Sequence, residues 1–282
     1  MNKFTVASFR EAKSKGKKIT MLTAYDYPTA KVLDEAGIDS ILVGDSVGTV
    51  VLGYDSTVKV TMEDMIHHIK AAARGTSRAL LIGDMPFLSY HTGKYESVRN
   101  AGRLLSEGGC SAVKLEGGEE IIDSVKAIIS AGIPVMGHLG YTPQSVNLFG
   151  GHKAQGKTIE TAKKIYRGAL ALQDAGVFGI VLECVPYKLA KFISSKLDVP
   201  TIGIGSGADC DGQVLVSYDM IGLFRDFTPK HVKKYLNIGS DMEKAAKMYI
   251  DEVENGVFPT EKNSFIVEDE IIEELEKEIG NI

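Results

Sequence analysis

The sequence predicts a single (β/α)8 barrel, and three observations support this fold class. Eight short apolar segments alternate with longer amphipathic segments between about residue 19 and residue 225. Most of the apolar segments are apolar on both faces, which is typical of parallel strands that are covered by helices. The chain has 282 residues, an ordinary length for one barrel of this kind.

An open doubly wound sheet is the alternative fold. Such a sheet usually carries the pattern G-x-G-x-x-G directly after its first strand. The first predicted strand here runs into "TAYDYPTA" (residues 23–30), which contains no glycine. We therefore expect one barrel domain over 1–282, with an N-terminal helix at 1–18, the barrel core at 19–226, and C-terminal helices and a tail at 227–282.

The elements follow from the pattern in order. The predicted strands are 19–25, 40–45, 79–84, 112–116, 134–140, 178–183, 200–207 and 214–219. The predicted helices are 5–15, 28–36, 61–75, 94–109, 118–133, 158–176, 228–254 and 267–282. Pro28 marks a helix start, and Thr61 with Asp64 forms a capping pattern. Glycines end four helices just before the next strand, at Gly37, Gly108, Gly132 and Gly176.

Composition excludes several classes of protein. The net charge is −5 and the chain has no polybasic block, which argues against nucleic acid or an anionic membrane as partner. No apolar segment approaches the roughly 18–20 residues that span a bilayer. The three cysteines, Cys110, Cys184 and Cys210, are widely spaced, as expected in a reducing compartment. We therefore expect a cytoplasmic protein that acts on small molecules.

Charged side chains gather where the predicted strands end. In this fold the active site lies at the carboxyl ends of the strands. The residues at these ends are Asp26, Asp45 followed by Ser46, Asp84, Lys114 and Glu116, His138, and Glu183. A lone aspartate after a strand is usually a helix cap or a turn former, and this reading is favoured for Asp26, since a helix begins directly behind it.

Three of these carboxylates indicate a hard divalent cation. Asp45, Asp84 and Glu116 on one barrel mouth would repel one another unless a cation or a proton holds them. Magnesium suits best, because it needs one or two carboxylates plus substrate and water oxygens. We expect Asp45 and Asp84 to be direct ligands, with Glu116 either a third ligand or a contact to a metal-bound water. Zinc is disfavoured, because no Cys/His pair has suitable spacing.

Lys114 and Glu116 lie two residues apart on one strand, so their side chains share a face. A lysine inside a barrel can be a Schiff-base nucleophile, or a fixed cation that grips a substrate carboxylate. The acids around Lys114 favour the second role, because nearby opposite charges keep an amine protonated. A third reading places Lys114 on the outer face, beside a helix.

Two further residues and one loop have alternative readings. Glu183 ends an apolar strand and is a candidate general base, or else a capping or salt-bridging glutamate. His138 lies in the glycine-flanked segment "MGHLG", which leaves room for a substrate, but it could equally be a core histidine. The loop 203–213, "GIGSGADCDGQ", resembles a phosphate cradle, although such glycines also serve tight barrel turns.

Seven motifs in order resemble the ketopantoate hydroxymethyltransferase family. They are "GDS" (44–46), "GDMPF" (83–87), "VKLEGG" (113–118), "GHLGYTPQS" (137–145), "GGHKAQGK" (150–157), "VLECVP" (181–186) and "TIGIGSGADCDGQVLV" (201–216). The resemblance covers about residues 3–265. His152, Lys157 and the looser "FPTEKNSF" (258–265) depart from the family pattern, and these departures touch loops and the tail.

The resemblance implies a barrel of the phosphoenolpyruvate/pyruvate type. It implies that Asp45 and Asp84 hold Mg²⁺ with Glu116 nearby, and that Glu183 is the proton acceptor. Ser46 and Lys114 would bind the substrate together with the two aspartates, and we add His138 to this substrate-binding group.

The resemblance also implies the activity and the assembly. A hydroxymethyl group would pass from 5,10-methylenetetrahydrofolate to 3-methyl-2-oxobutanoate through a Mg-stabilised enolate. The product would be ketopantoate, in pantothenate synthesis. The family forms homodecamers, in which the C-terminal helices dock on a neighbouring subunit.

Overall fold

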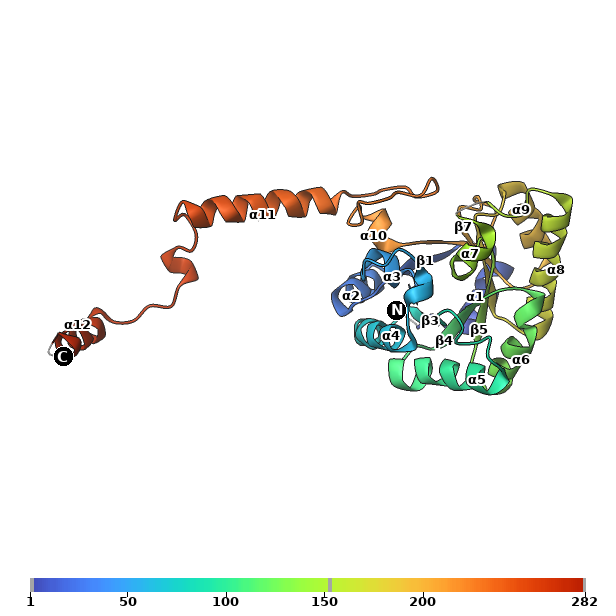
Figure 1. The fold of residues 1–282 in the computed structure, drawn as a ribbon, viewed down its shortest axis with the longest axis horizontal. Coiled ribbons are helices and arrows are strands. Elements are labelled where there is room, and N and C mark those ends of the chain that lie inside the picture. The colour runs from blue at the N-terminus through green and yellow to red at the C-terminus, as the bar shows by residue number, and fades with distance from the viewer. Residues whose placement is uncertain (1–2, 152–153, 281–282) are drawn as a thin grey trace. The chain divides into compact units, whose positions relative to one another are not determined.

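The computed structural model describes residues 3–151 and 154–280, and it confirms the predicted barrel (Figure 1). Eight parallel strands form a closed barrel in sequence order, and β1 pairs with β8 to complete it. The strands are β1 Ile19–Thr23, β2 Ser40–Val43, β3 Leu80–Asp84, β4 Ala112–Glu116, β5 Val135–Gly140, β6 Gly179–Glu183, β7 Thr201–Ile204 and β8 Gly212–Leu215.

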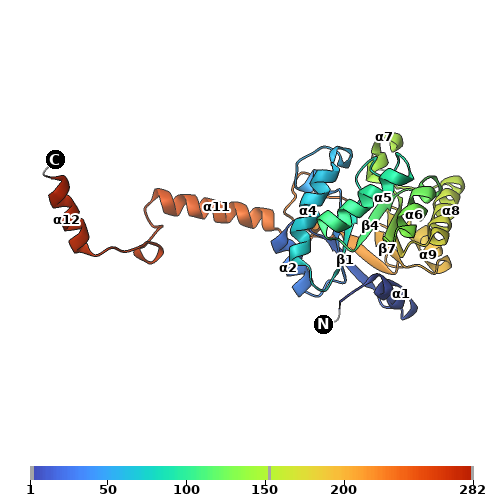
Figure 2. The ribbon, with the colours of Figure 1, turned by 90° about the horizontal axis from the view of Figure 1, so that it is seen from below.

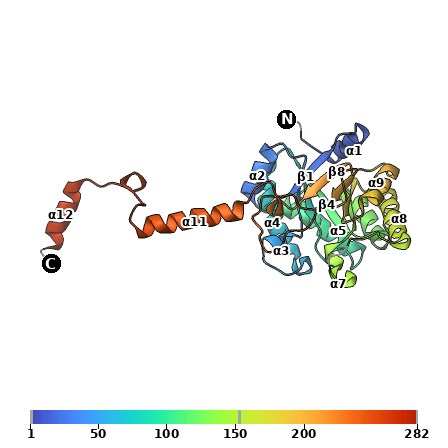
Figure 3. The same cartoon turned by 90° about the horizontal axis from the view of Figure 1, so that it is seen from above.

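Long helices lie outside the strands and cover them (Figures 1 and 3). These helices are α2 Tyr27–Glu35, α4 Met62–Gly75, α5 Lys94–Arg103, α6 Ile122–Ser130, α8 Ile159–Ala175 and α9 Tyr187–Lys196. Helix α1 (Val6–Ser14) and the short helix α7 (Val146–Phe149) lie at opposite ends of the barrel (Figure 2). The other short elements are α3 Val47–Val50, α10 Ser217–Met220, η1 Thr57–Lys59, η2 Leu104–Gly108, η3 Glu119–Ile121 and η4 Pro143–Ser145.

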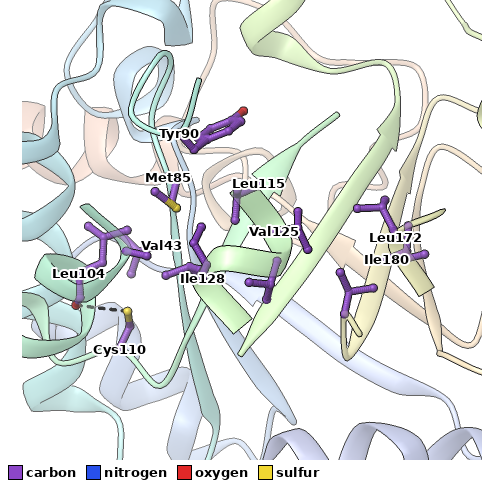
Figure 4. Close-up of a cluster of buried hydrophobic side chains, with 14 of the residues drawn as sticks. Val43, Met85, Tyr90, Leu104, Cys110, Leu115, Val125, Ile128, Leu172 and Ile180 are labelled. Carbon is purple, nitrogen blue, oxygen red and sulfur yellow. Dashed lines mark hydrogen bonds between the residues drawn. The ribbon is translucent and has the colours of Figure 1, made fainter. Parts of the chain in front are cut away.

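The core has two layers, because side chains of a strand alternate between its two faces. The outer layer packs strand residues such as Val43, Leu115 and Ile180 against the helices (Figure 4). The inner layer fills the barrel, and Phe9 of α1 closes it by packing edge-on against Phe178 with ring centroids 5.1 Å apart. Helix α1 therefore closes one end of the barrel. The last inward side chains of the strands lie at the other end, where the strands finish.

The inward alternation explains which residues reach the mouth. On β3, Leu80 and Ile82 belong to the inner layer, and Asp84 is the next residue on that face. On β4, Ala112 belongs to it, and Lys114 and Glu116 follow at the same spacing. The inward side chains of these strands are thus apolar inside the barrel and charged at its mouth, the end where the strands finish.

Several element boundaries differ from the prediction, most of all from β7 onward, where β7 ends at Ile204 rather than at 207. Strand β8 begins at Gly212, and the predicted strand residues 217–219 belong to helix α10 instead. Residues 228–237 were predicted as helix, but the helix that follows, α11, begins at Ile238. Tyr235 donates its backbone N–H to the carbonyl of Met220, a tertiary contact that replaces the helical hydrogen bond.

The predicted caps are largely confirmed. Asp26 caps α2 by accepting from the Thr29 backbone N–H at 2.8 Å, and Thr61 forms the expected capping box with Asp64. One glycine was misplaced by a residue: the left-handed position after η2 is Gly109 rather than Gly108.

The chain divides into two compact units, Met1–Tyr235 and Leu236–Ile282. The second unit contains α11 (Ile238–Glu254), the turn η5 (Glu261–Asn263) and α12 (Asp269–Ile279). Its apolar side chains are largely exposed. Within the described ranges, no helix combines the length and the apolar character that a membrane span requires.

Candidate active site

The strand ends bring the predicted site residues together at the carboxyl end of the barrel. Asp84 ends β3, Lys114 and Glu116 lie on β4, His138 lies on β5 and Glu183 ends β6. Strand pairing places Asp84 beside Lys114 and Glu116 beside His138. Asp45 follows β2 by two residues, and its backbone N–H donates to Asp84 Oδ2 at 3.2 Å. All of these side chains are buried except that of Glu183, which is partly exposed.

Lys114 is the charged centre of the cluster. Its Nζ lies 2.9 Å from Asp84 Oδ2 and 3.7 Å from Glu116 Oε1. Burial alone would lower the pKa of Lys114, but the carboxylates of Asp84, Glu116 and Asp45 outweigh burial and raise it. The ammonium is therefore protonated and inside the barrel, which rules out the outer-face reading.

His138 connects the two halves of the site. Its Nδ1 lies 3.2 Å from Lys114 Nζ and 3.3 Å from Glu116 Oε1, and its Nε2 lies 3.4 Å from Glu183 Oε2. Burial, and then the charge of Lys114, lower the pKa of His138, so its ring is neutral at neutral pH. A neutral ring that accepts from Lys114 at Nδ1 carries its proton at Nε2, where it can donate to Glu183.

The three inner carboxylates carry more negative charge than the protein neutralises. Burial, and then repulsion from Glu116, raise the pKa of Asp45 to about 6. Burial is also the main cause that raises the pKa values of Asp84 and Glu116. Three carboxylates beside the single ammonium of Lys114 leave two negative charges when ionised. A divalent cation would balance them.

The donor set fits magnesium. Asp84 Oδ1 and Glu116 Oε1 are buried and make no hydrogen bond in the part of the chain that the structure describes. Within residues 3–151 and 154–280, no three His, Cys, Asp or Glu side chains form a ready-made metal cage. Carboxylates completed by substrate and water oxygens are the usual environment of Mg²⁺, and the unbonded oxygens of Asp84 and Glu116 would suit it.

The backbone around Glu183 is unusually close-packed. A Cβ atom on Gly140, whose φ is +98°, would lie 2.2 Å from the Glu183 carbonyl oxygen. That carbonyl accepts from the Tyr141 backbone N–H at 2.8 Å. Cys184 adopts a φ of +51°, a left-handed conformation that is rare outside glycine. The chain is thus shaped locally to present the Glu183 side chain.

Other sequence candidates do not join the cluster. Asp26 serves as a helix cap, as described above. His67 and His68 are neighbours on α4 with ring centroids 5.2 Å apart, and His68 Nδ1 contacts the Tyr25 carbonyl. In the loop 203–213, Ser206 bonds within the barrel to Leu182 and Val185, which supports the tight-turn reading. His152 lies outside the described residues.

Sequence reasoning missed three neutral residues at the site. The Tyr25 hydroxyl lies 2.8 Å from the Ser46 hydroxyl. Gln144 donates to Asp45, and Tyr90 in turn contacts Gln144. Gln144 lies within the quoted segment "GHLGYTPQS", but a glutamine after a strand gives no charge signal that separates it from an ordinary turn residue.

Comparisons with known proteins bear on the family and the fold of the chain. The family model described as ketopantoate hydroxymethyltransferase matches residues 3–261. A 3-methyl-2-oxobutanoate hydroxymethyltransferase of Acetivibrio thermocellus is 75% identical over 276 residues, which cover 98% of each chain. The structure of phosphonopyruvate hydrolase has a similar fold, with a TM-score of 0.61 at 14% identity, covering 100% of this chain and 97% of the other. A complex of phosphonopyruvate hydrolase with oxalate and Mg²⁺ gives a TM-score of 0.57 at 15% identity, covering 93% of each chain.

Proposed function

The chain belongs to the ketopantoate hydroxymethyltransferase family, and from that premise we propose how its barrel mouth performs the reaction. The protein is an enzyme with 3-methyl-2-oxobutanoate hydroxymethyltransferase activity, and it forms ketopantoate in pantothenate synthesis. The co-substrate is 5,10-methylenetetrahydrofolate. The ion pair of Lys114 with Asp84, joined through His138 to Glu183, is the observation that carries the mechanism below.

We infer that Asp45 and Asp84 hold Mg²⁺, and that Glu116 lies just outside them. The excess negative charge and the unbonded Asp84 Oδ1 support this assignment. When bound, the ion supplies Lewis-acid polarisation of the keto group of the 2-oxo acid. The distant structural neighbour that binds Mg²⁺ with oxalate, a dicarboxylate, is consistent with the same chemistry.

Lys114 stabilises the negative charge that develops in the reaction. Its ammonium is fixed by Asp84 and lies on the inner face of β4. A charge that is already oriented in a buried site stabilises a developing oxyanion without reorganisation. The surrounding carboxylates raise the pKa of Lys114, which supports a fixed ammonium rather than a Schiff-base nucleophile. Ser46, held by the Tyr25 hydroxyl, contributes a polar contact to the substrate.

Glu183 removes the proton from C3 of the substrate. The C3–H bonding pair becomes the carbon–carbon double bond of the enolate, and the negative charge moves to the former keto oxygen. His138 Nε2 lies 3.4 Å from Glu183 Oε2, so a neutral ring with its proton on Nε2 would orient this carboxylate toward the substrate. Water cleaves both C–N bonds of the folate methylene bridge: its oxygen stays on the one-carbon unit, as formaldehyde, and its two protons go to the two folate nitrogens. C3 of the enolate then bonds to this carbon, and the resulting alkoxide takes up the proton held by Glu183, which gives the hydroxymethyl group.

Isotope exchange tests the role of Glu183. Glu183→Gln should abolish exchange of the C3 proton with deuterium, while calorimetry should still detect binding of the 2-oxo acid. Glutamine keeps the size and hydrogen-bonding capacity of the side chain but cannot accept the proton. Exchange at the parent rate in this variant would exclude Glu183 as the base.

The proposal also includes the assembly of the protein. The enzyme acts on small molecules, and we infer that it forms a homo-oligomer, as the family resemblance suggests, in the cytoplasm. The exposed apolar side chains of α11 and α12 support an assembly in which the second unit is covered by another subunit. The homodecamer of the family is the expected size.

A further inference from the structure

Gln144 occupies a junction between three strand ends. It lies in η4, which follows β5, and its side chain is 4% exposed. Its backbone N–H donates to Glu116 Oε2 at 3.0 Å, and its Nε2 donates to Asp45 Oδ2 and to the Met85 carbonyl, each at 3.0 Å. One residue therefore contacts the carboxylates that follow β2 and end β4, and the chain that follows β3.

Tyr90 fixes the orientation of the Gln144 amide. The Tyr90 hydroxyl donates to Gln144 Oε1 at 2.7 Å, and it accepts from the Glu116 backbone N–H at 3.2 Å. A flipped amide would direct its oxygen at the Asp45 carboxylate and the Met85 carbonyl, which are both acceptors. The partners thus determine which end of the amide faces Asp45, and all three of its hydrogen bonds are made.

The bonds restrain one oxygen of each carboxylate. Gln144 holds Asp45 Oδ2 and Glu116 Oε2, and Lys114 together with the Asp45 backbone N–H holds Asp84 Oδ2. The other oxygens of Asp84 and Glu116 remain without a hydrogen bond among the described residues. A site prepared in this way needs little rearrangement when a cation enters.

We propose that Gln144 is a positioning residue that sets Asp45 and Glu116 at a fixed separation for the divalent cation, with Tyr90 as its support. This inference rests on the proposed function, because it takes the Asp45–Asp84 pair as the metal site. A neutral amide is suited to the role: it donates to Asp45 without adding a fourth negative charge. Partners of this kind, which orient metal ligands from outside, typically contribute 10–100-fold to metal affinity.

Calorimetric titration of Mg²⁺ into the enzyme, without either substrate, tests the proposal directly. Gln144→Met keeps the length of the side chain and the backbone bond to Glu116, but it removes the side-chain donors to Asp45 and Met85. It should weaken Mg²⁺ binding by about 10–100-fold. Tyr90→Phe leaves the amide in place but frees its orientation, so a smaller loss in the same direction is expected. If Gln144→Met fails to fold, Tyr90→Phe still tests the proposal.

Gln173→Met is the matched control. Gln173 of α8 also bonds through its side chain, by accepting from the Asp198 and Val199 backbone N–H groups, but it contacts none of the site residues named above. It should leave the Mg²⁺ dissociation constant unchanged.

The Mg²⁺ dependence of turnover separates positioning from general support of the fold. Activity of Gln144→Met should recover at saturating Mg²⁺, whereas loss of structure would lower activity at every Mg²⁺ concentration. The proposal for Gln144 would be overturned if Gln144→Met and Tyr90→Phe both bound Mg²⁺ within twofold of the parent dissociation constant while Asp84→Ala abolished binding. That result would leave the proposed metal site itself intact. Equal binding in the parent and Asp84→Ala would instead remove the metal site itself, and this inference with it.

Discussion

Lys114 illustrates how one buried charge can serve both folding and catalysis. Its ammonium offsets part of the repulsion among three buried carboxylates, and we propose that the same charge stabilises the oxyanion that develops in the reaction. Removing one partner of a buried pair leaves the other charges uncompensated. The structural and catalytic roles of this residue are therefore measured together unless a control separates them.

Lys114→Met should lower kcat by about 10²–10³-fold, the typical effect of removing one group that stabilises an oxyanion. Steady-state kinetics at saturating Mg²⁺ provides the measurement. Lys13→Met is the control, because Lys13 pairs with Asp211 at 2.8 Å outside the mouth cluster, and its kcat should stay close to that of the parent. A kcat for Lys114→Met within tenfold of the parent would contradict the assigned role.

Asp219 of α10 should make the stability of the fold depend on pH. Burial raises its pKa to about 6, against an ordinary value of 3.8, and Lys234 only partly opposes the shift. Because the folded pKa is raised, ionisation favours unfolding: the penalty is absent below about pH 4 and is present in full above about pH 6. Asp219→Asn should therefore be more stable than the parent at pH 8 and equally stable at pH 4.

Urea denaturation at both pH values measures this difference. Asp55 is a useful comparison, since Lys59 lowers the pKa of Asp55 and its replacement by Asn should act in the opposite direction. An equal stability of Asp219→Asn and the parent at pH 8 would show that the Asp219 carboxylate is solvated in the native protein.

The sequence predicted which charged side chains meet at the strand ends, but it gave little sign of the neutral side chains beside them, for a physical reason. Asp84, Lys114, His138 and Glu183 lie on strands, where a two-residue alternation fixes which face each side chain occupies. Gln144 reaches Asp45 from a segment 99 positions away in the sequence. That contact depends on the path of the chain after β5, which no local periodicity records.

At the level of elements, β5 and β6 determine where Glu183, the proposed general base, lies. Gly140 pairs with Glu183 across these strands, and the two backbones approach more closely than a side chain would allow. Strand boundaries were predicted to within about two residues where apolar runs end sharply. The region after β8 was predicted less well, because the backbone N–H of Tyr235 bonds to the Met220 carbonyl of α10 rather than within a helix.

Gly140→Ala should reduce both stability and turnover. The new methyl group would overlap the Glu183 carbonyl oxygen, in addition to the cost of about 1–2 kcal/mol for a left-handed alanine. Gly132→Ala isolates the backbone cost, because Gly132 has a φ of +84° with open space around its Cβ position. Thermal unfolding and kcat should show a larger loss for Gly140→Ala; equal losses in the two variants would refute the close-contact argument.

At the level of the whole molecule, the two units differ in how much of their apolar side chains they bury. The barrel unit buries two apolar layers, whereas the second unit leaves Ile271, Ile272, Leu275 and Ile279 of α12 between 43% and 59% exposed. An amphipathic helix gains most of its stability by burying its apolar face against another surface. Assembly is the process that would provide such a surface.

Leu275→Asp should therefore reduce the size of the assembly, because it places a charge on the apolar face of α12. Sedimentation velocity measures the size directly. Glu273→Gln, a change on the charged side of the same helix, should leave the assembly intact. An unchanged sedimentation coefficient for Leu275→Asp would show that this face is not part of an interface.

The pairing of β1 with β8 has a consequence for biosynthesis. A chain that emerges from the ribosome can join neighbouring strands as they appear, but the ring stays open until residues 212–215 are available to residues 19–22. At 5–20 residues per second, the roughly 200 residues between them require roughly 10–40 s. Throughout this interval the nascent sheet has a free edge on each side, and free edges recruit other chains. The nascent chain is thus most exposed to aggregation until β8, the last strand to be translated, closes the barrel.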